Sequence, residues 1–267
     1  MTRKLLYSMG ASVLLAVALG AWTGKSEHAS EFTEIKEKST SATPSGAEVD
    51  ATPERSYRNH VRDLYRELGL AATGLDSTVF DSALTGFYNL KAAGKLSGDK
   101  DVLSIVDFTK SSREKRLWIL DLDRKEVAYN TWVAHGKNSG GDRATRFSNK
   151  ESSHQSSLGF FLTGEVYYGK HGRSLRLDGM DPGFNSNARK RAIVLHGADY
   201  VSPGFIKRVG RLGRSFGCPA VPADLSDEII DRIREKTVLY IHGPQTRYRS
   251  DYLNARSAAT FLMPVNG

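Results

Sequence analysis

One cysteine and one histidine are the residues of this sequence best suited to covalent chemistry. Cys218 is the only cysteine among the 267 residues, so within this chain it forms no disulfide and joins no multi-cysteine metal or iron–sulfur site. It follows Ser215-Phe216-Gly217, where the glycine permits a sharp turn whose backbone amides can point at one acceptor, as an oxyanion hole requires. A thiol is mostly protonated at neutral pH, so a nucleophilic Cys218 needs a nearby base or cation.

His196 is the best candidate for that base. The apolar run Ala192–Leu195 reads as a buried strand and leads directly into His196-Gly197, which places an imidazole at a strand end. Cys218 lies 22 residues later, far enough for a loop or short helix to fold back on the strand. The pattern predicts a thiol–imidazole pair; the alternative is a small buried cysteine and a hydrogen-bonded core histidine.

Glycine is concentrated just before the cysteine. Fourteen of the 25 glycines fall in the 82 residues from Gly136 to Gly217, where even spacing would place about eight. Such a segment is built of tight turns and close backbone approaches, which often carry binding and catalytic groups. We therefore expect the functional site at its end.

The elements that must position these residues are mostly strands. Two helices lead the domain, one ending at Gly69 and one running from the capping residue Asp76 to Gly94. A helix over Asp224–Glu235 follows the cysteine. Short apolar runs predict strands, the first three including a probable hairpin, over Val102–Phe108, Leu117–Leu122, Val127–Ala134, Leu158–Thr163, Ala192–Leu195 and Val238–Ile241. The prediction is a mainly β domain with helical additions at the N-terminus and after the cysteine.

The N-terminal segment indicates export. A basic start precedes apolar residues 5–21, with Ala18 and Gly20 spaced as at a signal-peptidase site, so residues 1–21 are expected to be a signal peptide. An uncleaved anchor is the alternative, because about 17 apolar residues is the short limit for a span. If the signal is cleaved, we expect no stable membrane span. Residues 22–55 are predicted to be a flexible polar linker, 56–250 a single domain and 251–267 a C-terminal tail.

The folded domain is basic. The chain carries a net charge of +8, and residues 51–267 alone carry +9. This balance suggests an anionic partner, although it can also serve solubility alone. No helix-turn-helix pattern, zinc finger or RNA-binding signature occurs in the sequence, so nucleic acid is not expected.

Several motifs of the sequence together resemble those of a known family. His196-Gly197 at a strand end, Ser215-x-Gly217-Cys218 and an apolar strand Thr237–His242 after a helix resemble the L,D-transpeptidase catalytic domain of the YkuD type. The fuller pattern is similar to the murein L,D-transpeptidases of bacterial envelopes, and the segments that carry this likeness are Ala134–Gly140, Gln155–Gly159, Gly169–Gly172 and Gly210–Ser215. The similarity spans roughly residues 75–243.

The resemblance implies a β-sandwich or barrel and a concrete reaction in the periplasm or cell envelope. Cys218 would attack the bond between the L-centre of diaminopimelate and the terminal D-alanine of a peptidoglycan stem. His196 would be the general base, oriented by the carbonyl of Gly197, and Ser215 and Gly217 would complete the catalytic motif. An amine of a neighbouring stem would then form a 3→3 cross-link; water in its place would make the protein an L,D-carboxypeptidase or endopeptidase. No bound cofactor or metal is expected, because thiol, imidazole and backbone amides suffice for acyl transfer.

Two positions depart from the family pattern. The second histidine, two residues before the cysteine, is replaced by Phe216, which cannot transfer a proton. The polar residue two positions after the cysteine is replaced by Ala220. The first change makes His196 the only local base, and Arg214 is a candidate donor from the other side. Reaction rate and choice of acceptor are left open.

Further residues are candidates for binding substrate. His171 and Arg176 are expected to bind stem carboxylates, unless His171 belongs to a surface loop. His135 and Asn138 lie at a strand end in a glycine-rich turn, where a purely structural role is equally compatible. The run Arg189-Lys190-Arg191 is interpreted as a solvated face that could attract anionic glycan.

Two other functional classes remain open. A zinc-dependent envelope peptidase could use histidines with an aspartate, although no paired-histidine helical motif occurs; the residues concerned are His135, His154, His171, His196, Asp142 and Asp178. A non-catalytic wall-binding module would keep the basic surface without needing Cys218. The sequence predicts no oligomeric state.

Overall fold

Two helices open the folded part of the chain. The computed structural model describes residues 52–264, so the predicted signal segment and the linker up to residue 51 lie outside the described residues. Helix α1 (Pro53–Glu67) has Pro53 in its first turn, and the hydroxyl of Thr52 accepts a hydrogen bond from the Arg55 N–H. Asp76 caps α2 (Ser77–Ala92) through the N–H groups of Thr78 and Val79, as its sequence position predicts.

The described residues form one eight-stranded sheet in the order β3-β2-β1-β8-β4-β5-β6-β7. The strands are β1 (Val102–Asp107), β2 (Leu117–Asp121), β3 (Glu126–Thr131), β4 (Gly159–Gly169), β5 (Gly172–Gly179), β6 (Val194–Ala198), β7 (Ala220–Pro222) and β8 (Val238–His242). Neighbouring strands are antiparallel except for β1 with β8 and β6 with β7. A bridge between Ala134, just after β3, and Ala220 in β7 joins the two edges, so the sheet nearly closes. The predicted mainly β fold is confirmed.

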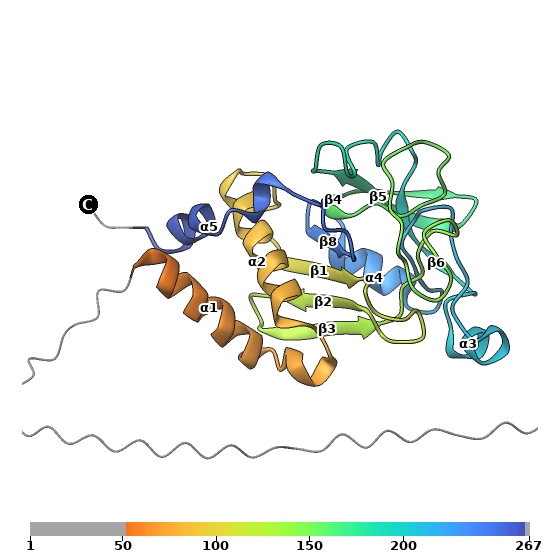
Figure 1. The fold of residues 1–267 in the computed structure, drawn as a ribbon, viewed down its shortest axis with the longest axis horizontal. Helices are drawn as coiled ribbons and strands as arrows, with labels where there is room; N and C mark the ends of the chain where they lie inside the picture. The colour runs from red at the N-terminus through yellow and green to blue at the C-terminus, as the bar shows by residue number, and fades with distance from the viewer. Residues whose placement is uncertain (1–51, 265–267) are drawn as a thin grey trace, which may run out of the picture. The chain divides into compact units, whose positions relative to one another are not determined.

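Alternate residues of the strands serve two cores. Leu103, Ile105 and Phe160 pack with α1 and α2, which cover one face of the sheet (Figure 1). Val106 and Phe161 point the other way, into a core that includes residues of α4 (Ser226–Ile233). This follows from the period of two in an extended strand. The central strands β1, β2 and β8 are therefore buried on both faces and support the loops that follow them.

The structure departs from the predicted domain boundaries. Helix α1 begins at Pro53, and α5 (Ala255–Leu262) lies within the segment predicted to be a tail. Ala258 and Ala259 are fully buried in the core shared with α1 and α2. The predicted tail therefore includes a structural helix, whose apolar stripe is too short to stand out in the sequence.

Two elements that the sequence did not predict lie within the glycine-rich segment. Strand β5 and the short helix α3 (Pro203–Val209) were not expected, because polar residues interrupt their apolar pattern.

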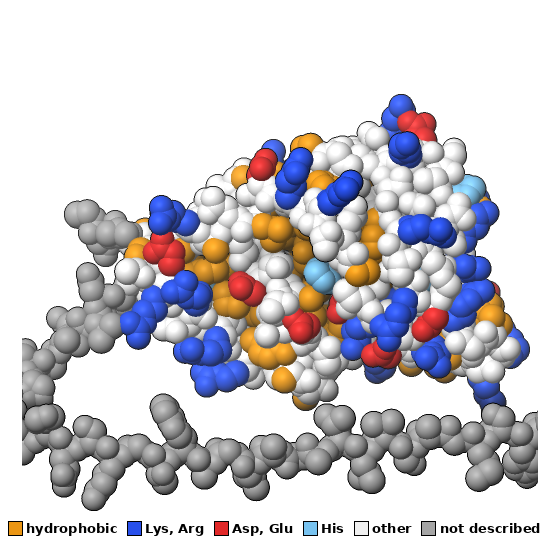
Figure 2. All heavy atoms as spheres, in the orientation of Figure 1, with side chains coloured by type: hydrophobic (Ala, Val, Ile, Leu, Met, Phe, Trp, Pro, Cys, Tyr) orange, Lys and Arg blue, Asp and Glu red, His pale blue; other side chains and the backbone are white. Residues whose placement is uncertain are grey.

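Lysine and arginine side chains are spread over the face shown in Figure 2, with acidic residues between them. Within residues 52–264, no helix has the length and apolar character needed to cross a membrane.

Candidate active site

Strand pairing brings the predicted nucleophile and base to the same place. His196 lies in β6, and β7 begins two residues after Cys218. The two strands are parallel, with His196 paired to Ala220, and the His196 N–H donates to the Pro219 carbonyl at 3.4 Å. The 22-residue separation in sequence is thus closed by two neighbouring strands.

Cys218 and His196 line one cavity of about 400 Å³. The cavity wall combines apolar, aromatic and cationic side chains, and the other lining residues are Tyr167, Lys170, His171, Arg191, Ala192, Ile193, Val194, Tyr200, Arg214, Ser215 and Phe216. Among the described residues the cavity contains one thiol and two imidazoles, with arginine and lysine side chains around them. It can therefore bring a nucleophile, a base and cations to one substrate.

The thiol of Cys218 is held by the edge of β6. The Val194 N–H donates to Sγ at 3.5 Å, and Sγ lies 3.8 Å from the carbonyl oxygen of Ala192. Burial raises the pKa of Cys218, while the Val194 N–H and the charge of Arg191 act in the opposite direction. The free thiol is therefore protonated at neutral pH and depends on a base to become a nucleophile.

The carbonyl of Gly197 fixes the tautomer of His196. Its Nδ1 lies 2.8 Å from the carbonyl oxygen of Gly197, which can only accept, so Nδ1 carries the proton and Nε2 has a free lone pair. The ring stacks on His171 with centroids 4.3 Å apart. Burial lowers the pKa of His196 below its usual value, which keeps the ring neutral at pH 7.

The turn before Cys218 presents backbone amides. The Ser215 hydroxyl donates to the Cys218 carbonyl at 2.6 Å and accepts from the Gly217 N–H at 3.0 Å. Gly217 has φ 125°, and a Cβ there would lie 2.8 Å from the Gln155 carbonyl oxygen, so the turn requires glycine. Within residues 52–264, the N–H groups of Phe216 and Cys218 donate to no backbone carbonyl, and the Cys218 N–H interacts with its own Sγ, which lowers the pKa of the thiol. These two amides are the donors available to a substrate oxyanion.

Phe216 occupies the rim of the cavity. Its side chain is 57 % exposed, and its ring lies 4.6 Å from that of His154, centroid to centroid. The ammonium of Lys137 is 4.3 Å from the Phe216 ring and that of Lys170 is 5.9 Å away. The aromatic ring thus joins cationic side chains at the cavity mouth.

Of the predicted substrate-binding residues, two line the cavity. His171 is exposed in the β4–β5 turn and stacks on His196. Arg214 also contributes to the wall, and its guanidinium donates to the carbonyls of Lys137 at 3.2 Å and Gly140 at 2.8 Å. Arg214 therefore also holds the loop over residues 137–140 in place.

The other three candidates lie outside the cavity lining. Arg176 pairs with Glu165 at 2.9 Å. His135 is buried, and its Nδ1 accepts from the Arg116 guanidinium at 2.8 Å, while burial and that cation lower its pKa to about 3. Asn138 donates to the Ser153 carbonyl at 2.8 Å. These contacts support structural roles.

The sequence interpretation missed Arg191. The charge run predicts a solvated side chain, but Arg191 lines the cavity and donates to the carbonyls of Ser148 and Gln155, each at 2.7 Å. Its position three residues before β6, the strand that carries His196, is the signal that could have identified it. Tyr200 was missed too; burial raises its pKa to about 12, so its hydroxyl stays protonated at the cavity wall.

The donor set of the zinc alternative is not assembled. Within the described part of the chain, no three histidine, cysteine or acidic side chains come together as metal ligands. Asp142 accepts hydrogen bonds from the hydroxyls of Ser111 and Ser112 at 2.7 and 2.8 Å. Asp178 pairs with Arg189. The aspartates proposed as ligands therefore have structural partners.

Comparisons with known proteins show what this chain is similar to. A search of curated proteins finds no match. Among solved structures, an L,D-transpeptidase from Mycobacterium smegmatis is similar at 13 % identity and TM-score 0.34, covering 54 % of this chain and 59 % of that one. The helical cell shape determining protein Pgp2 from Campylobacter jejuni is similar at 14 % identity and TM-score 0.37, covering 67 % and 62 %. The chain thus spans less than two thirds of the length of either protein.

The family itself is identified by sequence. The model of the L,D-transpeptidase catalytic domain matches residues 71–242, which include β1 to β8, the cavity and both Cys218 and His196. The match covers more than half of the chain. This protein therefore belongs to the L,D-transpeptidase catalytic domain family.

Proposed function

We propose that this protein is a cysteine-dependent L,D-transpeptidase that acts on peptidoglycan stems outside the cytoplasm. The observation that carries the proposal is the joint lining of one cavity by the Cys218 thiol and the His196 imidazole, whose protonated nitrogen is fixed by Gly197. Thiol, base and free turn amides are the parts that acyl transfer through a thioester needs.

The first half of the reaction forms the thioester. Nε2 of His196 takes the S–H proton of Cys218, and the thiolate attacks the carbonyl carbon at the L-centre of diaminopimelate. The amides of Phe216 and Cys218 donate to the oxyanion that forms. As the bond to D-alanine breaks, His196 returns the proton to the leaving amine, leaving the acyl group on sulfur.

The second half releases the acyl group. An amine of a neighbouring stem attacks the thioester, His196 accepts the proton that the amine loses, and the thiolate of Cys218 leaves and is reprotonated. The product is a 3→3 cross-link. A neighbouring cavity of about 610 Å³ shares His171 and Tyr200 with the Cys218 cavity. It offers space for a second stem, which favours transpeptidation over hydrolysis. Water as the acceptor gives a trimmed tripeptide instead.

Mass spectrometry of a single reaction tests the proposal. The purified protein is incubated with disaccharide tetrapeptide, and dimers, tripeptide and a covalent adduct on Cys218 are quantified. Dimers with an adduct support transpeptidation, and tripeptide without dimers supports the carboxypeptidase. Activity that persists in Cys218→Ala contradicts the thiol mechanism. Loss with a chelator and recovery with zinc would indicate the metallopeptidase, and binding without turnover the wall-binding module.

A further inference from the structure

Arg191 is a fixed cation in the wall of the cavity. Its guanidinium is half-buried and makes four hydrogen bonds to a single loop, donating to the carbonyls of Ser148 and Gln155 and to the hydroxyls of Ser153 and Ser157. A side chain held this way cannot turn out into solvent without losing all four bonds. Its charge therefore stays in the cavity wall.

That charge is uncompensated in the folded protein. Among the described residues, no carboxylate lies within salt-bridge distance of Arg191, whereas Arg189, two residues earlier, pairs with both Glu165 and Asp178. A half-buried cation without a counterion attracts an anion, and the one group of this cavity wall that becomes an anion during the proposed reaction is the Cys218 thiol.

The guanidinium is also close to the turn that carries the thiol. A Cβ on Gly217 would lie 3.4 Å from Nη2 of Arg191 and 2.8 Å from the Gln155 carbonyl that Arg191 holds. Arg191 therefore lies directly against the residue before Cys218.

We propose that Arg191 is a positioning residue that stabilises the thiolate of Cys218 from the cavity wall. The inference rests on the proposed thiol mechanism and assigns a role that neither Phe216 nor Ala220 can supply. Burial raises the pKa of the Cys218 thiol, and the Arg191 charge offsets part of that effect. Other titratable groups line the same cavity, namely Tyr167, Lys170, His171, His196, Tyr200 and Arg214.

The test is the pH dependence of alkylation by iodoacetamide, measured on the full chain, where Cys218 is the only thiol. In Arg191→Gln we expect the midpoint of the alkylation rate to rise by about one pH unit. Arg191→Lys retains the charge, so its midpoint should stay within about 0.3 unit of the wild type. Lys170→Gln is the matched control, because Lys170 lines the same cavity but is exposed, and it should shift the midpoint by less than half as much.

Two outcomes would overturn the proposal: an unchanged midpoint in Arg191→Gln, or an equal rise in Arg191→Lys, which would make loop geometry the cause. Should Arg191→Gln lose the wild-type circular dichroism spectrum, Arg191→Met replaces it, because an unbranched apolar side chain fills similar space without the charge. A midpoint equal to that of the wild type in Arg191→Met overturns the proposal. The alkylation test needs no peptidoglycan substrate. It is therefore independent of the turnover assay, in which an active Cys218→Ala protein would refute the proposed function.

Discussion

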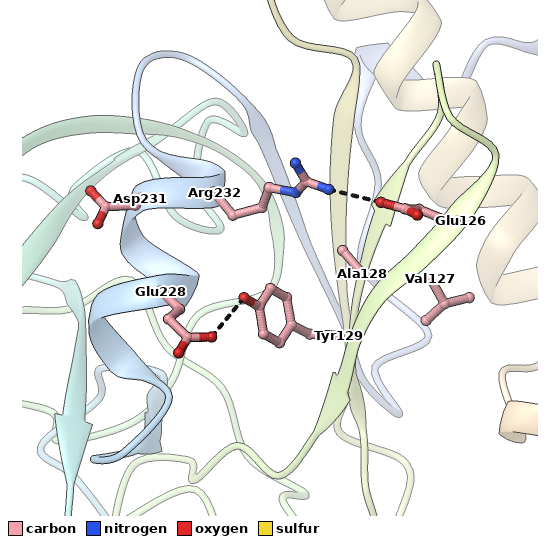
Figure 3. A pocket seen from close by; sticks show the side chains of 7 residues that line it. All are labelled: Glu126, Val127, Ala128, Tyr129, Glu228, Asp231 and Arg232. Carbon is pink, nitrogen blue, oxygen red and sulfur yellow. Dashed lines mark hydrogen bonds and ion pairs between the residues drawn. The ribbon is translucent and has the colours of Figure 1, made fainter.

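Two cavities of this protein have similar volumes and opposite chemistry. The cavity lined by Cys218 measures about 400 Å³, and a second, between β3 and α4, measures about 480 Å³ (Figure 3). In the second, Arg232 donates to Glu126 at 3.0 Å and the Tyr129 hydroxyl donates to Glu228 at 3.1 Å. Its charged groups satisfy one another across the gap between strand and helix.

The difference shows that size does not identify a reactive site. Exposed ion pairs such as Arg232 with Glu126 contribute about 0–1 kcal/mol and hold their partners in place. The Cys218 cavity instead contains a thiol, an imidazole of fixed tautomer and a guanidinium that pairs with no carboxylate of residues 52–264, and burial shifts the pKa of each. Groups that lack compensation are the ones available to a substrate.

Among these predictions, loss of the thiol should have the largest effect on activity. We expect Cys218→Ala to reduce cross-linking of disaccharide tetrapeptide by at least about 10³-fold, because no other nucleophile lines the cavity with a base beside it. Product formation by mass spectrometry measures the loss. Cys218→Ser provides the conservative control, and wild-type turnover in either variant would contradict the assignment.

The turn before the cysteine should be the next most sensitive. Gly217→Ala places a methyl group 2.8 Å from the Gln155 carbonyl at φ 125°, so we expect a loss of about 1–3 kcal/mol in the free energy of unfolding and at least about tenfold in activity. Gly183→Ala is the matched control, because Gly183 also has positive φ, at 80°, but has open space around it. Its cost should be about 1 kcal/mol with wild-type activity. Equal losses of stability and activity in both variants would show that the close approach of Gly217 to the Gln155 carbonyl does not matter.

Buried histidines should make the protein less stable in acid. In the unfolded chain His135 binds a proton near pH 6.5, whereas in the folded protein its pKa is about 3, so the free energy of unfolding falls as the pH drops between these values. Between pH 6 and pH 4, His135→Gln should reduce this fall by about 2 kcal/mol, as measured by urea unfolding at both pH values. An unchanged pH dependence in the variant would mean that His135 is protonated in the folded state.

Local patterns made much of the fold predictable from sequence. The Asp76 cap and the β1 to β3 run are visible as short-range signals. The strand predicted over Ala192–Leu195 is instead β6, which contains His196 in its middle and not at its end. Strand pairing across the sheet was not visible, because register depends on partners far apart in the chain. The sequence therefore predicts part of β6 but not its neighbour β5, in which only Leu175 and Leu177 are apolar.

The candidate site was predictable to a different degree. Cys218 and His196 stand out by residue type and by the glycine before the thiol, and the structure places them in one cavity. Arg191 was misjudged because charge runs are usually solvated, and only the fold shows that its four hydrogen bonds turn it inward. For His135 the sequence leaves binding and structural roles open, and its burial against Arg116, which favours the structural role, cannot be predicted from a glycine-rich turn.

The smallest effects should come from the cavity between β3 and α4. Tyr129→Phe removes a surface hydrogen bond to Glu228 and leaves the ring in place, so we expect a change of at most about 0.5 kcal/mol in the free energy of unfolding. Cross-linking activity should equal that of the wild type, because none of these residues lines the Cys218 cavity. Urea unfolding and the mass-spectrometric assay, run beside Cys218→Ala, measure both quantities. A fall in activity without a fall in stability would show that the two cavities are coupled. The paired charges between β3 and α4 would then contribute to the reaction together with the groups of the Cys218 cavity.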